Sequence, residues 1–323
     1  MNRLQSYRYI EGKTQQDLGE MLGVSAALIS AVESGRRPLT FDVSQTGYTE
    51  ARFALPTMSE PLHRQRAATR VASTRRAKEL LRVAGELFIE LRNRNPHVPR
   101  PTLPRWPTPA TFDEIENLTI DTRLELAQEE TGPIKNLTSA AERAGICLIP
   151  IVGLEGIDGI SAWVDDQPVI GLSPNVPGDR FRFSLAHEIA HLAFHRTKGE
   201  TSEAQANRFA GALLIGRDDF DAAVTQTSIR DFINLKATWG VAVGALVYRA
   251  HELGYIDDRR YRTLQIQMSR WRRSEPGSFP PRPGQLLPRL IETAGGVRQV
   301  AEALGMNPLH VAEVADWRPM RAA

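Results

Sequence analysis

Two histidines and a glutamate occur within five residues of the segment HEIAHLAFH, which spans residues 187–195. Histidines four residues apart lie one turn apart on one face of a helix, so the imidazoles of His187 and His191 can reach a single metal ion. Glu188 is displaced by about 100° around the helix and can reach a water at the metal, as a general base must. The spacing predicts a catalytic zinc half-site. A packed helix with two satisfied core histidines is the alternative, although these polar groups are costly to bury without a partner.

A catalytic zinc also needs a third protein ligand and an open fourth position. His195 lies about 12 Å from His187 along a continuous helix, which is too far. Glu203 is the better candidate, because its segment SEAQANRFAGALLIG follows a turn at Gly199. Asn207 lies one helical turn later on the same face, where it can brace a ligand. Glu203 also suits the first turn of a helix, where the dipole favours an acid, so a structural role is the alternative.

Composition limits both the metal ligands and the compartment. Cys147 is the single cysteine, which excludes a disulfide framework and a cysteine zinc cluster. Histidine and carboxylate ligands suit Zn²⁺ and do not exclude manganese. The chain has no apolar run of eighteen or more residues, and its N-terminus MNRLQSYRYIEGKTQQ carries charges where a signal peptide needs an apolar stretch. We therefore expect a cytoplasmic protein that does not act at a membrane.

The elements that must position these residues lie on both sides of a proline-rich segment. Residues 95–109 contain six prolines, which favour an extended, semi-rigid spacer between domains. Before it, apolar residues at helical spacing predict an amphipathic helix over residues 73–93. After it, short apolar runs at 146–152, 159–164 and 168–174 predict a sheet of about three strands, with helical patterns before and after them. The predicted fold class is α+β and predominantly α-helical.

A helix-turn-helix pattern occupies the segment TQQDLGEMLGVSAALISAVESGRRP, residues 14–38. Thr14 and Ser25 are good N-caps, and Gly23 supplies the turn between the two helices. Residues 3–38 resemble the Xre/Cro-type helix-turn-helix of phage and bacterial repressors. The resemblance implies an all-α N-terminal domain that binds DNA in the major groove through the helix beginning at Ser25. A helical hairpin that contacts protein is the alternative.

The expected DNA contacts of this motif fall into two groups. The residues best placed to reach base edges are Ser25, Ala26, Ala27 and Ser30. None of them offers a bidentate partner such as Arg, Asn or Gln, so we expect weak sequence reading by this helix. The phosphate contacts are then left to Gln15, Gln16, Arg36 and Arg37.

The distribution of charge along the chain is uneven. Residues 1–105 carry 17 Lys or Arg against 10 Asp or Glu, and residues 106–323 carry 23 against 28. A basic first third suits a nucleic-acid-facing module, with chance variation of solvated faces as the alternative.

A fainter copy of the helix-turn-helix spacing lies near the C-terminus, in VRQVAEALGMNPLHVAEV, residues 297–314. Its apolar, glycine and cap positions are Val300, Leu304, Gly305, Asn307 and Val311. A generic helix pair explains this pattern as well as a second DNA reader does.

Four segments contain the metal motif or flank it: GISAWVDDQPVIGLSPN before it, RFRFSLAHEIAHLAFH around it, and EAQANRFAGALLI and GVAVGALVYRAHELGYI after it. Together they resemble the ImmA/IrrE metallo-endopeptidases over about residues 137–257. The resemblance implies a zincin-like domain with a gluzincin-like site, in which His187, His191 and Glu203 match the zinc ligands and Glu188 matches the general base. The segment LLIG departs from the family's usual LLMP. Such proteins cleave helix-turn-helix repressors in phage-immunity and stress-response circuits, and a subset is fused to an N-terminal Xre module.

We therefore predict an Xre-type domain at residues 1–58, a basic amphipathic helix and proline-rich linker at 59–110, a metallopeptidase domain at 111–262, and a proline-rich segment with a helical tail at 263–323. The predicted function is a zinc-dependent endopeptidase that binds DNA and cleaves a repressor in a phage-immunity, stress-response or mobile-element circuit. A homodimer is compatible with this organisation. The alternative is a DNA-binding transcriptional regulator or antitoxin whose zinc domain senses or binds a partner without proteolysis.

Overall fold

The computed structural model describes residues 2–55, 71–127, 130–152, 156–195, 199, 201–271 and 275–318. The chain forms two compact units, each built from separate stretches of sequence. The first unit combines residues 1–99, 147–171 and 284–323, and the second combines residues 100–146 and 172–283. The predicted α+β class is confirmed, since helices predominate and the described strands form a three-stranded sheet. The four domain ranges given above stay a prediction. Among the described helices, none is long and apolar enough to cross a membrane.

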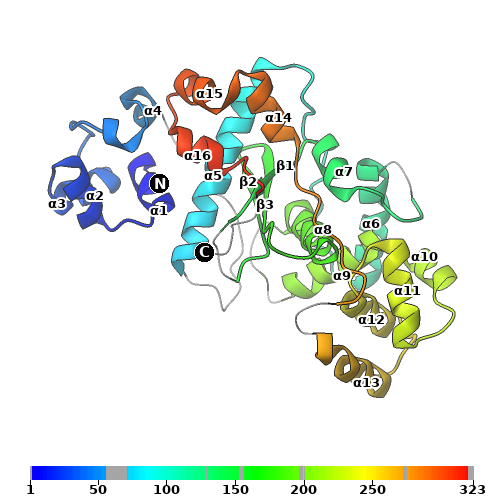
Figure 1. The fold of residues 1–323 in the computed structure, drawn as a ribbon. Coiled ribbons are helices and arrows are strands. Elements are labelled where there is room, and N and C mark those ends of the chain that lie inside the picture. The colour runs from blue at the N-terminus through cyan, green and yellow to red at the C-terminus, as the bar shows by residue number, and fades with distance from the viewer. Residues whose placement is uncertain are drawn as a thin grey trace. The chain divides into compact units, whose positions relative to one another are not determined.

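The first unit is built around α5 (Val71–Arg94), which packs against the sheet (Figure 1). The strand order is β1–β3–β2, with β1 at Cys147–Pro150, β2 at Gly159–Val164 and β3 at Gln167–Leu172. The apolar residues that predicted this helix are all buried, namely Leu80, Leu81, Ala84, Leu87, Phe88 and Leu91. Gly85 permits the close approach of helix and sheet, because a Cβ at this position would lie 2.6 Å from the Cβ of Val164.

The N-terminal helices of the same unit form the expected helix-turn-helix. They are α1 (Arg3–Ile10), α2 (Gln15–Leu22) and α3 (Ala26–Glu33), followed by η1 (Ser44–Thr46) and α4 (Glu50–Ala54). Thr14 and Asp17 form a reciprocal capping box at the start of α2, and the Ser25 hydroxyl accepts a hydrogen bond from the Leu28 amide at the start of α3. Gly23 has a φ of 68°, so it makes the left-handed turn that glycine favours.

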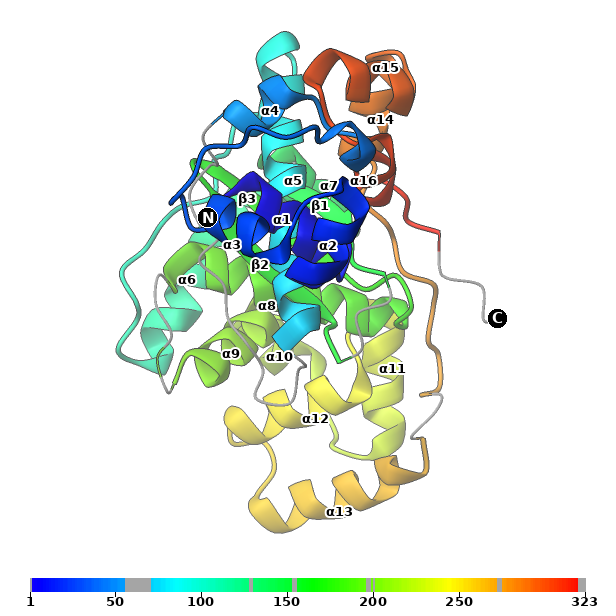
Figure 2. The ribbon, with the colours of Figure 1, turned by 90° about the vertical axis from the view of Figure 1, so that its left-hand side faces the viewer.

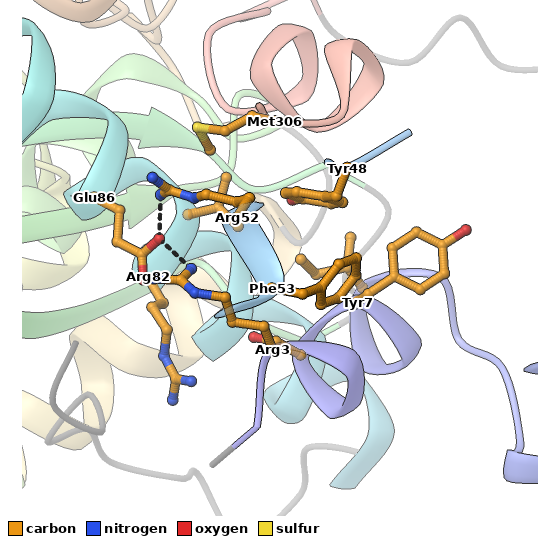
Figure 3. A pocket seen from close by; sticks show the side chains of 11 residues that line it. Arg3, Tyr7, Tyr48, Arg52, Phe53, Arg82, Glu86 and Met306 are labelled. Carbon is orange, nitrogen blue, oxygen red and sulfur yellow. Dashed lines mark hydrogen bonds and ion pairs between the residues drawn. The ribbon is translucent and has the colours of Figure 1, made fainter. Parts of the chain in front are cut away.

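Buried ion pairs join the helix-turn-helix to α5. Glu86 of α5 accepts hydrogen bonds from the guanidinium groups of Arg3 and Arg52 (Figure 3). Ser6 of α1 donates a hydrogen bond to Glu79 of α5. The cavity between these side chains has a volume of about 20 Å³, which is room for a single water. The helix-turn-helix is therefore packed on α5 within this unit.

The C-terminal helices α14 (Leu286–Thr293), α15 (Gly296–Leu304) and α16 (Pro308–Glu313) complete the first unit (Figure 2). Asn307 caps α16 and also donates a hydrogen bond of 2.8 Å to the carbonyl oxygen of Thr46. His310 is buried, and its ring nitrogens lie 2.8 Å from the hydroxyl of Tyr48 and 2.8 Å from a carboxylate oxygen of Glu11. The end of the chain thus packs against the beginning.

The second unit is helical, and its helices are α6 (Phe112–Ala127), α7 (Leu137–Arg143), α8 (Gly178–Phe194), α9 (Ser202–Leu214), α10 (Arg217–Ala223), α11 (Ile229–Trp239), α12 (Val243–Glu252), α13 (Asp258–Met268) and η2 (Ser269–Trp271). Helix α9 packs against α6, α8 and α12. Glu116 of α6 binds Arg249 of α12 through two hydrogen bonds of 2.6 and 2.7 Å, and Arg208 of α9 lies 3.0 Å from the same carboxylate. This buried cluster joins α6 and α12 to α9.

Candidate metal centre and nucleic-acid interface

The histidines of the central motif and Glu203 come together where α8 and α9 pack against each other. The Nε2 atoms of His187 and His191 lie 3.0 Å apart. The carboxylate oxygens of Glu203 lie 3.7 Å from Nε2 of His187 and 3.5 Å from Nε2 of His191. One ligand atom from each of the three residues lies within 4.8 Å of the others. This geometry suits a divalent cation held by two imidazoles and one carboxylate.

The outer nitrogen of each imidazole is held by a neighbour. Nδ1 of His187 lies 2.9 Å from the side-chain oxygen of Asn207, which can only accept, so this Nδ1 carries the proton. Nδ1 of His191 lies 2.8 Å from Nδ1 of His195. His195 is the residue after the end of α8, where its extended backbone turns the ring back toward His191. Asn207 thus contacts the imidazole of His187, and its role as a brace for a metal ligand stays a prediction.

A chain of hydrogen bonds selects the tautomer of His191. Gln205 donates from Nε2 to the carbonyl oxygen of Pro109 at 2.7 Å, so its Oε1 faces Nε2 of His195 at 3.0 Å and accepts from it. A neutral His195 then accepts at Nδ1, and His191 must donate from its own Nδ1. The same reasoning leaves a lone pair on Nε2 of both His187 and His191. Two facing lone pairs at 3.0 Å repel each other unless a cation lies between them, so the residues present fit a metal ion.

The surroundings of this centre are apolar on one side and open on the other. His187 is 6% exposed and Glu188 is 8% exposed, while their helix neighbours Ala186 and Ile189 are fully buried. The side chain of Glu203 is 34% exposed, which leaves a route from solvent to the ligands. An apolar setting strengthens charge interactions at the centre.

The proline-rich segment contributes directly to this centre. Residues 95–111 form neither helix nor strand, and residues 102–110 lie along the second unit. The amide of Trp106 and the hydroxyl of Thr108 donate to the last carbonyl oxygens of α8, at Ala193 and Phe194, over 2.7 and 2.8 Å. Pro109 then holds Gln205. The segment begins with a turn at residues 96–97, and from Trp106 on it is docked against the end of α8 and Gln205, next to the candidate ligands.

The residues expected to contact DNA lie at the start of α3 and around it. Ser25 and Ala27 are exposed, whereas Ala26 and Ser30 are half-buried. Gln15 donates to Glu33 at 2.8 Å and Gln16 donates to Glu20 at 3.1 Å, so both amides already have partners within the protein. Arg36 and Arg37 follow α3 and are exposed. Over the described residues Arg36 donates only from Nε, to Ser34 at 2.8 Å, and both arginines are charged and exposed, so within this set they suit phosphate best. All eight assignments stay predictions.

The C-terminal copy of the spacing folds as a helix pair whose second helix packs inward. Val300 and Val311 are buried, Gly305 has a φ of 62°, and Asn307 is the N-cap, as the spacing requires. His310 lies in the middle of α16 and is 1% exposed. The exposed residues at the start of α16 are Pro308 and Leu309, whose side chains offer no hydrogen bond to a base edge, which favours the generic helix pair.

The fold and the site define a helix-turn-helix protein with an H-E-x-x-H helix of the metallopeptidase type. Comparison with protein-family models agrees: the model described as IrrE N-terminal-like domain matches residues 141–251, and the model described as Helix-turn-helix matches residues 7–45. The chain is thus a DNA-binding protein that carries an IrrE-like domain of a metallopeptidase family. No curated protein matches the chain.

The sequence did not predict two residues that position the candidate ligand His191: His195, which contacts it, and Gln205, which contacts His195. His195 was excluded as a ligand on distance, but its contact with His191 was not foreseen, because the end of α8 at Phe194 cannot be read from helical spacing. Gln205 was not singled out. The i, i+4 spacing of His191 and His195 was the available signal, since such residues are neighbours even at a helix end.

Proposed function

We propose that the second unit is a zinc-dependent endopeptidase centre and that the helix-turn-helix brings it to DNA. The observation that carries this proposal is that Nε2 of His187 and Nε2 of His191 lie 3.0 Å apart, with the carboxylate oxygens of Glu203 3.7 and 3.5 Å from them. Membership of the matched domain in a metallopeptidase family supports it. Manganese is an alternative ion for the same ligands.

His187, His191 and Glu203 would hold the ion. A zinc ion in this position would acidify a water and polarise a peptide carbonyl. Glu188 follows His187 on α8 and would act as the general base, which takes a proton from the water and passes it to the leaving amine. Asn207 and His195 would keep both imidazoles in the tautomer that binds the ion. The chain's own residues thus supply the ligands, the base and the orientation.

We further propose that the substrate is a helix-turn-helix repressor. The fusion of a DNA-binding module to the peptidase-type domain supports this, because binding near an operator would raise the local concentration of a repressor bound there. The same module would alternatively repress the gene of the chain itself. Both ideas require DNA binding near physiological salt, and a binding assay that finds no affinity there excludes both.

The first experiment is the metal content of the purified full-length protein by plasma mass spectrometry. We expect one zinc per chain in the wild type and a sharp loss in His191→Ala and in Glu203→Ala. Glu125→Ala, an exposed glutamate of α6, is the matched control and keeps the metal. Absence of stoichiometric metal in the wild type, even after reconstitution with zinc, refutes the metal centre.

The second experiment separates the peptidase from a non-proteolytic regulator. Glu188→Gln leaves the three ligands intact, so it retains zinc and abolishes cleavage of a co-expressed repressor. If the regulatory output survives in Glu188→Gln, catalysis is not the function and the DNA-binding regulator is the correct reading. The variant's metal content, measured in parallel, shows that the loss comes from the base.

A further inference from the structure

A second polar site lies in the second unit, away from the metal ligands. It is a cavity of about 430 Å³ between the turn before α7, the first residues of α8, the end of α11 and the loop at residues 279–282. The volume is in the range of small-molecule sites. The lining carries three cationic side chains, Lys135, Arg182 and Arg282, and no carboxylate among the described lining residues. We refer to it as the Arg182 pocket.

Arg182 is the most unusual group in this pocket. Its Nη1 donates to the carbonyl oxygen of Ile134 at 2.8 Å. Its Nε and Nη2 are buried and have no hydrogen-bond partner in the part of the chain that the structure describes. These two nitrogens form the side edge of the guanidinium, the edge that pairs with two oxygens of a carboxylate or phosphate. Buried donors left without a partner are costly, so this edge is suited to an oxyanion.

The electrostatics of the pocket agree with this chemistry. Burial, together with the nearby positive charges of Arg282 and Arg123, lowers the pKa of Arg182 to about 10. The guanidinium of Arg182 thus lies close to other positive charges. An anion bound there would stabilise the charged forms of Arg182, Arg282 and Arg123 together. Because the free nitrogens of Arg182 are enclosed, an anion that pairs with them must displace part of the lining. The exposed Arg282 and Lys135 are the charges that it meets first.

Three aromatic residues contribute to the wall of the pocket, beside aliphatic residues and the polar Asn136, Thr138 and Thr238. Phe181, Trp239 and Phe279 line it, and a Cβ on Gly240 would lie 3.5 Å from both Nε of Arg182 and Cζ of Phe279. Aromatic walls beside a guanidinium favour a ligand with an apolar ring. The loop that carries Phe279 is anchored, because the Phe279 carbonyl oxygen accepts a hydrogen bond of 2.6 Å from the Gly178 amide. The pocket wall is thus tied to the start of α8.

We propose that the Arg182 pocket binds a small organic oxyanion, a phosphate or carboxylate joined to an apolar ring. The pocket is separate from the metal centre, since Arg182 precedes His187 by five residues and points about 140° away from it around α8, about 7.5 Å along the axis. Both groups lie on α8, but on different faces of the helix.

The test is calorimetric titration of the full-length protein with phenyl phosphate, benzoate and inorganic phosphate. We expect saturable binding of phenyl phosphate or benzoate that is tighter than binding of inorganic phosphate, because only the first two fill the aromatic part. The tighter of the two ring-bearing probes identifies the head group. Arg282→Gln should weaken the binding about tenfold or more, as expected for loss of a charged hydrogen bond. Arg182→Gln should weaken it further.

Two control variants test whether the probes bind in this pocket, and not at other exposed arginines or at the metal centre. Arg143→Gln removes an exposed arginine of α7 that does not line the pocket, and it should bind as the wild type does. His191→Ala should also bind normally, because the metal centre is not involved. The proposal is overturned if no ring-bearing probe binds at about 10 mM, a concentration far above ordinary ligand affinities. It is also overturned if Arg282→Gln, on an exposed loop and with a native circular dichroism spectrum, leaves binding unchanged.

Discussion

Substitution of His195 by alanine should weaken metal binding although His195 does not reach the metal. His191 has Nδ1 within 2.8 Å of His195, and this contact keeps the proton on Nδ1 and the lone pair on Nε2. Without it, the ring of His191 is free to rotate and to change tautomer. Loss of such an outer partner typically lowers metal affinity by about 10–100-fold, which corresponds to about 1.4–2.8 kcal/mol.

Asn207→Ala tests the equivalent contact on the other imidazole, where the partner atoms lie 2.9 Å apart. Because the two contacts act on different ligands, the double variant His195→Ala/Asn207→Ala should lose about 10²–10⁴-fold if the effects add. His251→Ala is the matched control, since His251 is bonded to Asp258 and is not one of the clustered ligands. It should bind zinc as the wild type does.

The assay is competition for zinc with a chromophoric chelator at pH 7.5, with circular dichroism of each variant as a check of folding. Unchanged affinity in a natively folded His195→Ala would refute the tautomer argument, provided that His191→Ala loses the metal. An equal loss in His251→Ala would refute it as well, because the effect would then be a general consequence of removing a histidine.

Three further predictions concern DNA binding, stability and pH. The double variant Arg36→Gln/Arg37→Gln should weaken DNA binding without changing the sequence preference. The slope of log affinity against log salt concentration should fall by the amount expected for about one to two lost phosphate contacts, measured by fluorescence anisotropy at several salt concentrations. Glu116→Ala removes the carboxylate nearest to the buried arginines Arg208 and Arg249, which leaves them Glu252 at 3.7 and 4.0 Å. It should lower the free energy of unfolding by about 3 kcal/mol in urea titration, whereas Asp113→Ala, which removes an exposed ion pair, should cost about 1 kcal/mol or less. Burial lowers the pKa of His310 below its usual value of 6.5. As the pH drops through about 6.5, His310 therefore takes up a proton in the unfolded chain before it does so in the folded protein. The free energy of unfolding should fall over this range, down to the lower pKa of the folded state. His310→Gln should show a smaller fall in melting temperature between about pH 7 and 5, and an equal fall in both proteins would contradict this.

Local features of the fold could be predicted from the sequence because they depend on residues close together in the chain. The N-caps Thr14 and Ser25, the turn at Gly23 and the apolar face of α5 all follow from side chains within a few positions of each other. The pairing of His187 with His191 is of the same kind, since helical spacing alone places them on one face. These local features are enough to predict the helix-turn-helix and two of the three candidate metal ligands.

Contacts between distant residues were decided only by the tertiary structure. The link from His191 through His195 and Gln205 to Pro109 joins segments 96 residues apart, and no periodicity within either segment indicates it. The packing of α16 against the helix-turn-helix joins the two ends of the chain, with His310 and Glu11 299 residues apart. Neither contact can be predicted from spacing, because chain connectivity does not restrict which distant side chains meet. The sequence by itself thus determined which residues could bind a metal and which could form the DNA-binding helices. Tertiary packing determined how the imidazoles are oriented, and it alone created the Arg182 pocket.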